Sequence, residues 1–223
     1  MTKESYDYKV IIPGGAKMPK ETFFNLPPEK RERIEASAIK EFRDYYFDAS
    51  SINRIVEEAG IAKGSFYQYF EDKKDLYKHV MNIIIQKKLE YMTPTLMNPM
   101  DLDIFSLIKE MYVSGLNFAL HNPELLEISN RLLSDPNHDL YKEIVEENKE
   151  KSDQVFHQLL KMAEERGEIR SGLDLSLVAY LLTSLNISVS DYYMKRNETK
   201  TYSKEMLDVV ESFLDVVKYG IKC

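Results

Sequence analysis

Two short helical patterns on either side of Gly60 constrain the fold of this chain more than any other feature. In the first pattern, apolar residues recur with the spacing i, i+3, i+4 and i+7: Ile52, Ile55, Val56 and Ala59. Gly60 follows, at the position where a left-handed residue commonly ends a helix. A second short helix is predicted from about Lys63 to Phe70, held to the core by Ile61 and Phe66. Two short helices joined by a turn of about four residues that contains glycine make a helix-turn-helix.

The outer side of the second helix has the chemistry of a surface that reads DNA. Gly64 lets the backbone approach closely, and the side chains on this side are polar: Lys63, Ser65, Tyr67 and Tyr69. Lysine can pair with a phosphate or bind a guanine edge, and hydroxyl groups can donate to phosphate oxygens. Ser51, at the start of the preceding helix, and Lys73, at the start of the next one, are predicted to contact the DNA backbone. Each residue taken alone also has an ordinary explanation, because tyrosines often pack into cores and lysines after turns are usually solvated.

Helical periodicity runs through most of the remaining chain and predicts an all-α fold. Pro27-Pro28 opens a helix that extends to about residue 47. Asp72 caps a helix that continues to about Tyr91, before a loop marked by Pro94 and Pro99. Five further helices are predicted, over residues 101–121, 123–134, 138–166, 174–196 and 203–221. The total is about nine helices, with no strand of note after residue 26.

Residues 1–26 are predicted to form an N-terminal extension. Pro13-Gly14-Gly15 interrupts any regular element, and a mobile tail is the simplest interpretation of such a terminus. The apolar residues near position 10 leave open a short strand or docking on the body. A helix-turn-helix DNA-binding domain is predicted over residues 27–78, and a ligand-binding and dimerisation domain over residues 79–223.

The distribution of charge permits DNA binding without requiring it. The chain of 223 residues has a net charge of −7. Residues 1–80 contain 14 Lys/Arg and 14 Asp/Glu, whereas residues 81–223 contain 16 and 23, so the C-terminal part carries all of the excess. An acidic C-terminal part would be repelled by phosphates, while a neutral N-terminal part can still present one basic face.

Residues 30–77 resemble the DNA-binding domain of the tetracycline-repressor (TetR) family. The resemblance depends on these residues: Phe42, Ser50-Ser51, Ile55, Ala59-Gly60-Ile61, Lys63-Gly64-Ser65-Phe66-Tyr67, Tyr69-Phe70, Lys73 and Leu76. It implies a three-helix head, a linking fourth helix, and a homodimer that binds a palindrome in double-stranded DNA. It also implies a repressor that a small molecule releases.

By position, the resemblance assigns DNA contacts to a defined set of residues: Ser51, Lys63, Ser65, Tyr67 and Lys73, with Asn53 and Tyr69 as candidates for base recognition. Ala62 departs from the family pattern, which often has serine there to cap the recognition helix. Alanine at this position costs about 1 kcal/mol of local helix stability.

The C-terminal part offers candidates for an effector pocket. The predicted helix over residues 101–121 is apolar on most sides and should lie inside a bundle. In the family the central helices surround the effector, so Phe105, Tyr112 and Phe118 are candidates to line a pocket; filling the core is the alternative. On the helix over residues 138–166, Asn148 and Ser152 interrupt an apolar seam that includes Phe156. These two polar residues are either anchors for a small apolar or aromatic ligand or the place where the helix projects into water.

The last two predicted helices, over residues 174–196 and 203–221, carry broad apolar faces. One monomer cannot easily cover both faces, so we expect two copies of each helix to form a four-helix dimer interface. Two-fold symmetry of this kind matches a palindromic operator.

The sequence offers no catalytic constellation, and we expect neither enzymatic activity, a cofactor nor a bound metal. The four histidines are scattered, and Cys223 is the only cysteine. No apolar run has the length of about 20 residues that spans a membrane, so a cytoplasmic location is predicted. The alternative function is a constitutive DNA-binding co-regulator whose C-terminal bundle binds a protein. A helical enzyme has no support beyond an acidic surface.

Overall fold

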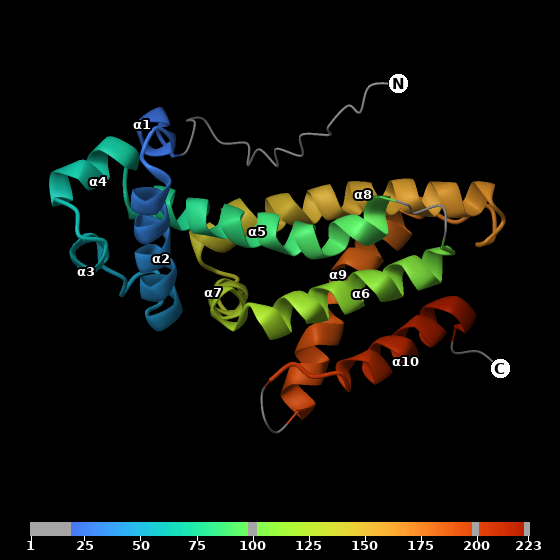
Figure 1. Cartoon of the computed structure of the whole chain (residues 1–223). Coiled ribbons are helices and arrows are strands. Elements are labelled where there is room, and N and C mark those ends of the chain that lie inside the picture. The colour runs from blue at the N-terminus through green and yellow to red at the C-terminus, as the bar shows by residue number, and fades with distance from the viewer. Residues whose placement is uncertain (1–18, 98–101, 198–200, 221–223) are drawn as a thin grey trace. The chain divides into compact units, whose positions relative to one another are not determined.

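The computed structural model describes residues 19–97, 102–197 and 201–220, and all regular structure within these ranges is helical (Figure 1). The chain divides into two compact units. The first, here called the head, comprises residues 1–87 and 124–134. The second, here called the bundle, comprises residues 88–123 and 135–223.

The head contains five helices and the beginning of a sixth. They are α1 (Glu21–Phe24), α2 (Pro28–Asp44), α3 (Ile52–Glu58), α4 (Lys63–Tyr69), the first part of α5 (Lys73–Met97), and α7 (Pro123–Leu133). Proline occupies the first helical position of α2, where its missing N–H group has no helical partner to lose. At the start of α5, the backbone N–H of Asp75 donates to Asp72 Oδ1 over 2.8 Å. The backbone N–H of Glu71 donates back to Asp75 Oδ2 over 2.9 Å, which completes a reciprocal cap.

Aromatic rings from four helices and from the residue that ends α4 fill the core of the head. The side chains with at most 1% exposure include Phe23, Phe42, Phe66, Phe70, Ile34, Ile55, Leu76, Ile84 and Ile128. Phe23 lies 4.9 Å from Phe70 and Phe42 lies 4.9 Å from Tyr77, measured between ring centroids. Because α7 contributes Ile128, a segment far along the sequence belongs to the same core as the helix-turn-helix.

The bundle contains the rest of α5 and four further helical elements. They are α6 (Ile104–His121), a π-helical segment η2 (Tyr141–Glu146) that continues into α8 (Glu147–Glu165), α9 (Leu175–Arg196) and α10 (Met206–Tyr219). Asp103 caps α6 by accepting from the N–H groups of Phe105 and Ser106, at 3.0 and 3.2 Å. Asp174 caps α9 in the same way through Leu177. Buried residues of α6, α8, α9 and α10 form one apolar cluster.

The predicted helices are present, and three details of the prediction are corrected. The helix that begins after Asp72 was expected to end near Tyr91, but α5 continues through Pro94 to Met97, because a proline removes one hydrogen bond without necessarily ending a helix. The predicted helix over 138–166 begins with a π-helical turn, which apolar spacing does not distinguish from an α-turn. Residues 1–18 lie outside the described residues, but residues 19–26 are not a mobile tail, since they include α1 with Phe23 fully buried.

Candidate DNA-binding site

The turn between α3 and α4 is fixed by a complete hydrogen-bonded cap. The N–H of Gly60 donates to Glu57 O over 3.1 Å, and the N–H of Ile61 donates to Val56 O over 3.0 Å. This is the Schellman pattern, which requires a left-handed residue, and Gly60 has a φ of 64°. No atom lies within 4 Å of the place where a Cβ on Gly60 would stand, so backbone conformation rather than space demands glycine here.

One side of α4 faces the core and the other faces solvent. Phe66 is fully buried and Tyr69 is 6% exposed, whereas Tyr67 is 46% exposed. Lys63, Gly64 and Gln68 are also exposed, and Ser65 is half-buried. The outer side is therefore polar, short and interrupted by a glycine.

Tyr69 faces the core rather than the outer side of α4 where the sequence analysis placed it, and Gln68 is exposed instead. Tyr69 was placed on the outer side with Tyr67, but it comes three residues after Phe66 and shares that residue's inward face. Gln68, which the sequence analysis did not single out, takes the outward position. Counting helical positions from buried Phe66 would have found it. Glutamine can pair with the edge of adenine in the major groove.

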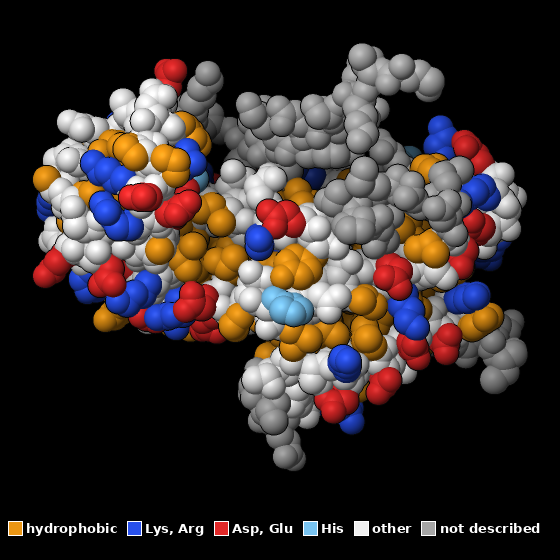
Figure 2. Space-filling view, in the orientation of Figure 1, with side chains coloured by type: hydrophobic (Ala, Val, Ile, Leu, Met, Phe, Trp, Pro, Cys, Tyr) orange, Lys and Arg blue, Asp and Glu red, His pale blue; other side chains and the backbone are white. Residues whose placement is uncertain are grey.

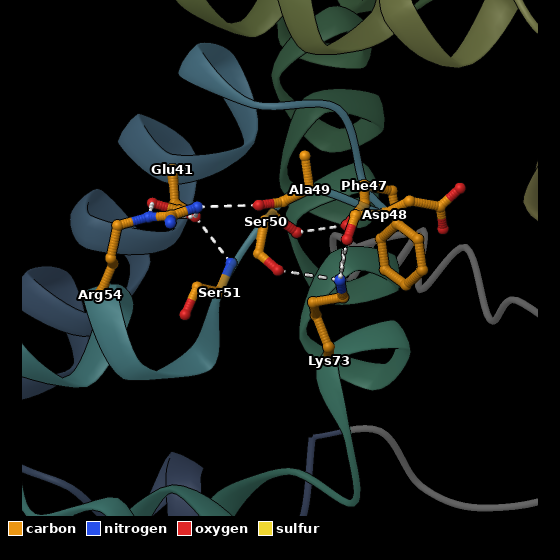
Figure 3. A network of polar contacts seen from close by, with 8 residues as sticks. All are labelled: Glu41, Phe47, Asp48, Ala49, Ser50, Ser51, Arg54 and Lys73. Atoms are coloured by element: carbon orange, nitrogen blue, oxygen red, sulfur yellow. Dashed lines mark hydrogen bonds and ion pairs between the residues drawn. The ribbon is translucent and has the colours of Figure 1, made fainter.

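The N-terminus of α3 is held to α2 by a buried carboxylate (Figure 3). Glu41, 6% exposed, accepts the backbone N–H of Ser51 over 2.7 Å and the Nη2 of Arg54 over 2.5 Å. Arg54 also donates to Ala49 O over 2.9 Å, and its hydrogen bonds to Glu41 raise the pKa of its guanidinium. A buried charge needs such a partner. The sequence analysis missed this pair. A glutamate close to the apolar residues Ala38 and Phe42 on α2 indicates a carboxylate that faces the core and needs a partner.

The ammonium group of half-buried Lys73 donates hydrogen bonds to the loop between α2 and α3 (Figure 3). Its Nζ donates to the main-chain carbonyl groups of Phe47, Ser50 and Asp48, at 2.6, 2.9 and 3.3 Å. Burial lowers the pKa of this ammonium. The sequence analysis expected Lys73 to grip the DNA backbone, but here the side chain ties the start of α5 to the loop between α2 and α3.

Ser51 and Asn53 lie where α3 begins, and both remain accessible. Ser51 is half-buried with an extended backbone, and Asn53 is exposed. On the face drawn in Figure 2, Lys/Arg and Asp/Glu side chains are interspersed over α2, α3 and α4 rather than gathered into one basic field. On this face, opposite charges therefore lie close together, and a long-range field of one sign is not expected there.

Comparison with known proteins decides the family. Residues 34–80 match the family model of bacterial regulatory proteins of the tetR family, and residues 102–222 match the tetracyclin repressor-like C-terminal domain. The chain belongs to the TetR family of transcriptional regulators. It is non-enzymatic, and it binds DNA through the helix-turn-helix of the head.

Relatives and solved structures are similar to this TetR-family chain over most of its length. The uncharacterized regulator YezE of Bacillus subtilis is 26% identical over 184 residues, covering 80% of this chain and 92% of YezE. A TetR-family regulator of Chloroflexus aurantiacus is 30% identical with a TM-score of 0.63, covering 91% of this chain and 98% of that one. FadR of Bacillus subtilis, solved in complex with stearoyl-CoA, shares the fold with a TM-score of 0.66 at 19% identity, covering 86% of this chain and 99% of FadR.

In this TetR-family chain, the six residues predicted to line an effector pocket do not gather at one place. Tyr112 and Phe156 belong to the buried cluster of the bundle, and Phe105 packs against its edge. Asn148 donates to Ile144 O and Ser152 to Asn148 O, at 2.6 and 3.0 Å, so both polar groups bond within their own helical segment. A groove between α8 and α9 is lined by none of the six; its residues are Asp153, Gln154, His157, Gln158, Ser176 and Ala179.

Phe118 lies apart from that cluster, next to a charged residue that the sequence analysis did not consider. Its ring centroid is 6.0 Å from that of Tyr91 and 5.3 Å from Lys88 Nζ. Burial lowers the pKa of the Lys88 amine to about 8. Within the described ranges, no group of three or more His, Cys, Asp or Glu residues could hold a metal ion, and no helix is long and apolar enough to span a membrane.

Proposed function

We propose that this TetR-family regulator is a homodimeric repressor that binds a palindromic operator and is released by an apolar effector. The observation that carries the proposal is the outward polar side of α4, on a helix held by buried Phe66 and by the glycine turn. A helix presented in this way fits the major groove, which is wide enough to admit it.

The proposed contacts divide into backbone and base contacts. Ser51 and Lys63 bind phosphates, Tyr67 and Ser65 donate hydroxyl hydrogen bonds, and Gly64 lets the helix approach closely. Asn53 and Gln68 contact base edges, because their amides can pair with adenine. Tyr69 and Lys73 are left out of this set, because Tyr69 is buried and the ammonium of Lys73 donates to main-chain carbonyl groups of the loop between α2 and α3.

The homodimer is supported by apolar side chains that α9 and α10 leave exposed. Residues with at least 36% exposure on these two helices are Leu177, Tyr180, Leu181, Leu185, Ile187, Tyr192, Val216, Val217 and Tyr219. Apolar side chains that gather on a surface mark interaction sites in soluble proteins. We propose that α9 and α10 of two copies pack together, which brings two α4 helices to one duplex with two-fold symmetry.

The proposed effector carries an apolar chain and an acidic group. The apolar part is supported by the fold shared with FadR, which was solved with stearoyl-CoA. The acidic group is supported by half-buried Lys88, whose ammonium Nζ lies 5.3 Å from the centroid of the Phe118 ring. An anionic group of a ligand is attracted to a cation that is partly removed from water.

One observation favours a second function, a constitutive regulator whose bundle binds a protein. Tyr112 and Phe156 are buried in the packed cluster, and Asn148 and Ser152 already have hydrogen-bond partners. In a bundle packed in this way, these candidate residues leave no unfilled apolar surface or unsatisfied polar group for a small ligand to contact. The two functions differ in whether any small molecule weakens DNA binding.

The deciding experiment is the selection of bound sequences from random DNA by the purified full-length protein. The expected result is a two-fold symmetric site whose half-sites lie about one helical turn apart. Binding to that site is then measured with stearoyl-CoA, free stearate and an uncharged stearoyl ester. Release by the acidic ligands supports the repressor, release by none of them supports the constitutive regulator, and failure to enrich any sequence refutes both.

A further inference from the structure

The recognition helix α4 is weak by its own sequence. It has seven residues, contains Gly64, and begins after Ala62, whose side chain makes no capping hydrogen bond. A helix of two turns is marginal in isolation, and glycine in its interior makes it weaker. Packing of Phe66 and Tyr69 supplies part of the order that DNA recognition needs, and the C-terminal end of α4 receives further support.

That support comes from the segment before α2, which bonds to three successive carbonyl groups at the end of α4. The N–H of Lys20 donates to Tyr69 O over 2.9 Å, and the Lys20 ammonium donates to Tyr67 O over 3.1 Å. The hydroxyl of Thr22 donates to Gln68 O. The last carbonyl groups of a helix have no partner within it, and a cation near them interacts favourably with the helix dipole.

Phe23 anchors this segment. It is fully buried, and its ring centroid lies 4.9 Å from that of Phe70, directly after α4, and 5.2 Å from that of His79 on α5. The neighbouring Phe24 is 52% exposed. The anchor therefore fixes where Lys20 and Thr22 meet α4.

We propose that residues 20–23 act as a strap that holds α4 in its DNA-binding orientation, with Thr22 and Lys20 as positioning residues. The proposal rests on the proposed function only in taking α4 as the helix that reads DNA. A helix that leaves its binding conformation part of the time binds with an affinity reduced by the competent fraction. The strap raises the fraction of molecules in which α4 is competent to bind DNA. It does so by stabilising the C-terminal end of α4, whereas the N-terminal end has no side-chain cap.

Thr22→Val in the full-length protein tests the strap, because valine keeps the shape and charge and removes the hydroxyl donor. The expected result is specific DNA binding weaker by about two- to fivefold, the size that one lost hydrogen bond allows. Binding to unrelated DNA and the salt dependence of binding should not change, since both report phosphate contacts. The melting temperature should stay close to that of the wild type.

Amide hydrogen exchange measures the effect of the strap on α4 in the absence of DNA. In Thr22→Val, the amides of Lys20 and Phe70 should exchange faster, while those in the middle of α2 should not. Thr22→Ser, which keeps the donor, should restore both affinity and exchange. Glu21→Gln, an exposed change on α1, is the control and should leave both unchanged.

Two results would overturn the strap: unchanged specific affinity in Thr22→Val, or equal loss of specific and non-specific binding together with a lower melting temperature. If the wild-type protein selects no DNA sequence, the proposed function fails, and unchanged exchange at Lys20 and Phe70 would then overturn the strap separately.

Discussion

The recognition helix α4 and the long helix α9 both place a buried residue directly beside an exposed one, with opposite implications. On α4, Phe66 is fully buried and Tyr67 is 46% exposed. On α9, Leu182 is 5% exposed and Leu181 is 45% exposed. The exposed member is a polar phenol in the head and an aliphatic chain in the bundle.

This difference separates two kinds of partner. A phenol hydroxyl at a surface can donate a hydrogen bond to a phosphate, and it is stable in water until DNA arrives. An exposed leucine gains only from other apolar groups, and several of them on one helix call for a protein surface. The same alternation thus predicts a nucleic acid for α4 and a second copy of the chain for α9.

The largest effect is expected from substitutions of the buried and the exposed residue of the pair on α4. Phe66→Ala should lower the free energy of unfolding by about 3–5 kcal/mol, because it leaves a cavity in the core of the head. Tyr67→Ala should leave the melting temperature within a few degrees of the wild type but weaken operator binding at least about tenfold, the size of one lost charge-assisted hydrogen bond in each of two copies. Thermal unfolding followed by circular dichroism and titration of operator DNA measure the two. A large drop in melting temperature for Tyr67→Ala would place that residue in the core.

The pair on α9 should behave in the same way: substitution of the buried residue should lower stability. Substitution of the exposed residue should change the oligomeric state rather than DNA binding. Leu182→Ala should lower the free energy of unfolding by about 2–5 kcal/mol. Leu181→Glu should yield a folded monomer, because two buried carboxylates would face each other across the proposed dimer interface. Light scattering after size-exclusion chromatography measures the mass, and Glu165→Gln, an exposed change on α8, serves as the control. A Leu181→Glu protein that remains dimeric would place the interface elsewhere.

The sequence predicted the head in more detail than the bundle, for a physical reason. Glycine at a turn, apolar spacing and short polar helices are local signals, so Gly60, Ile55 and Phe66 identify the helix-turn-helix without any knowledge of its surroundings. The hydrogen bonds that orient it are not local. Glu41 and Arg54 are 13 residues apart, and Lys20 meets a carbonyl group 47 residues away.

In the bundle, periodicity located the helices but could not tell a pocket wall from a core. Phe156 and Phe118 are both buried, yet they lie in different surroundings. Asn148 interrupts an apolar seam, but its amide bonds to its own helical segment, an outcome that depends on side-chain rotation rather than spacing. The sequence analysis assigned no role to Lys88, because periodicity alone does not identify its contact with Phe118.

A third comparison concerns two charged side chains, Glu41 in the head and Lys88 in the bundle. Glu41 in the head has Arg54 as a direct partner. Arg54→Met should lower the melting temperature, but by less than the loss of a fully buried pair would, because Arg54 remains 45% exposed. Thermal unfolding measures the change, and Lys40→Met, which removes an exposed ion pair with Glu58, is the control with a small effect. If Glu41→Gln restores the stability of Arg54→Met, the loss comes from the unpaired carboxylate.

The smallest expected effect concerns Lys88, where burial lowers the amine pKa from 10.5 to about 8. Below about pH 8 the amine is protonated in the folded and unfolded states alike, and the folded state bears a cost because the ammonium is partly removed from water. From about pH 8 upward the folded amine loses its proton while the unfolded one keeps it, so this residue makes stability rise with pH. Lys88→Met should therefore be more stable than the wild type by about 1 kcal/mol near pH 7, and the difference should shrink toward about pH 9.5.

Measurements stop there because burial raises the pKa of Tyr77 to about 12, so that tyrosine ionisation in the unfolded chain lowers stability at higher pH. A difference between the two proteins that does not change with pH would mean that the Lys88 amine is solvated, and the acidic group would then be removed from the proposed effector.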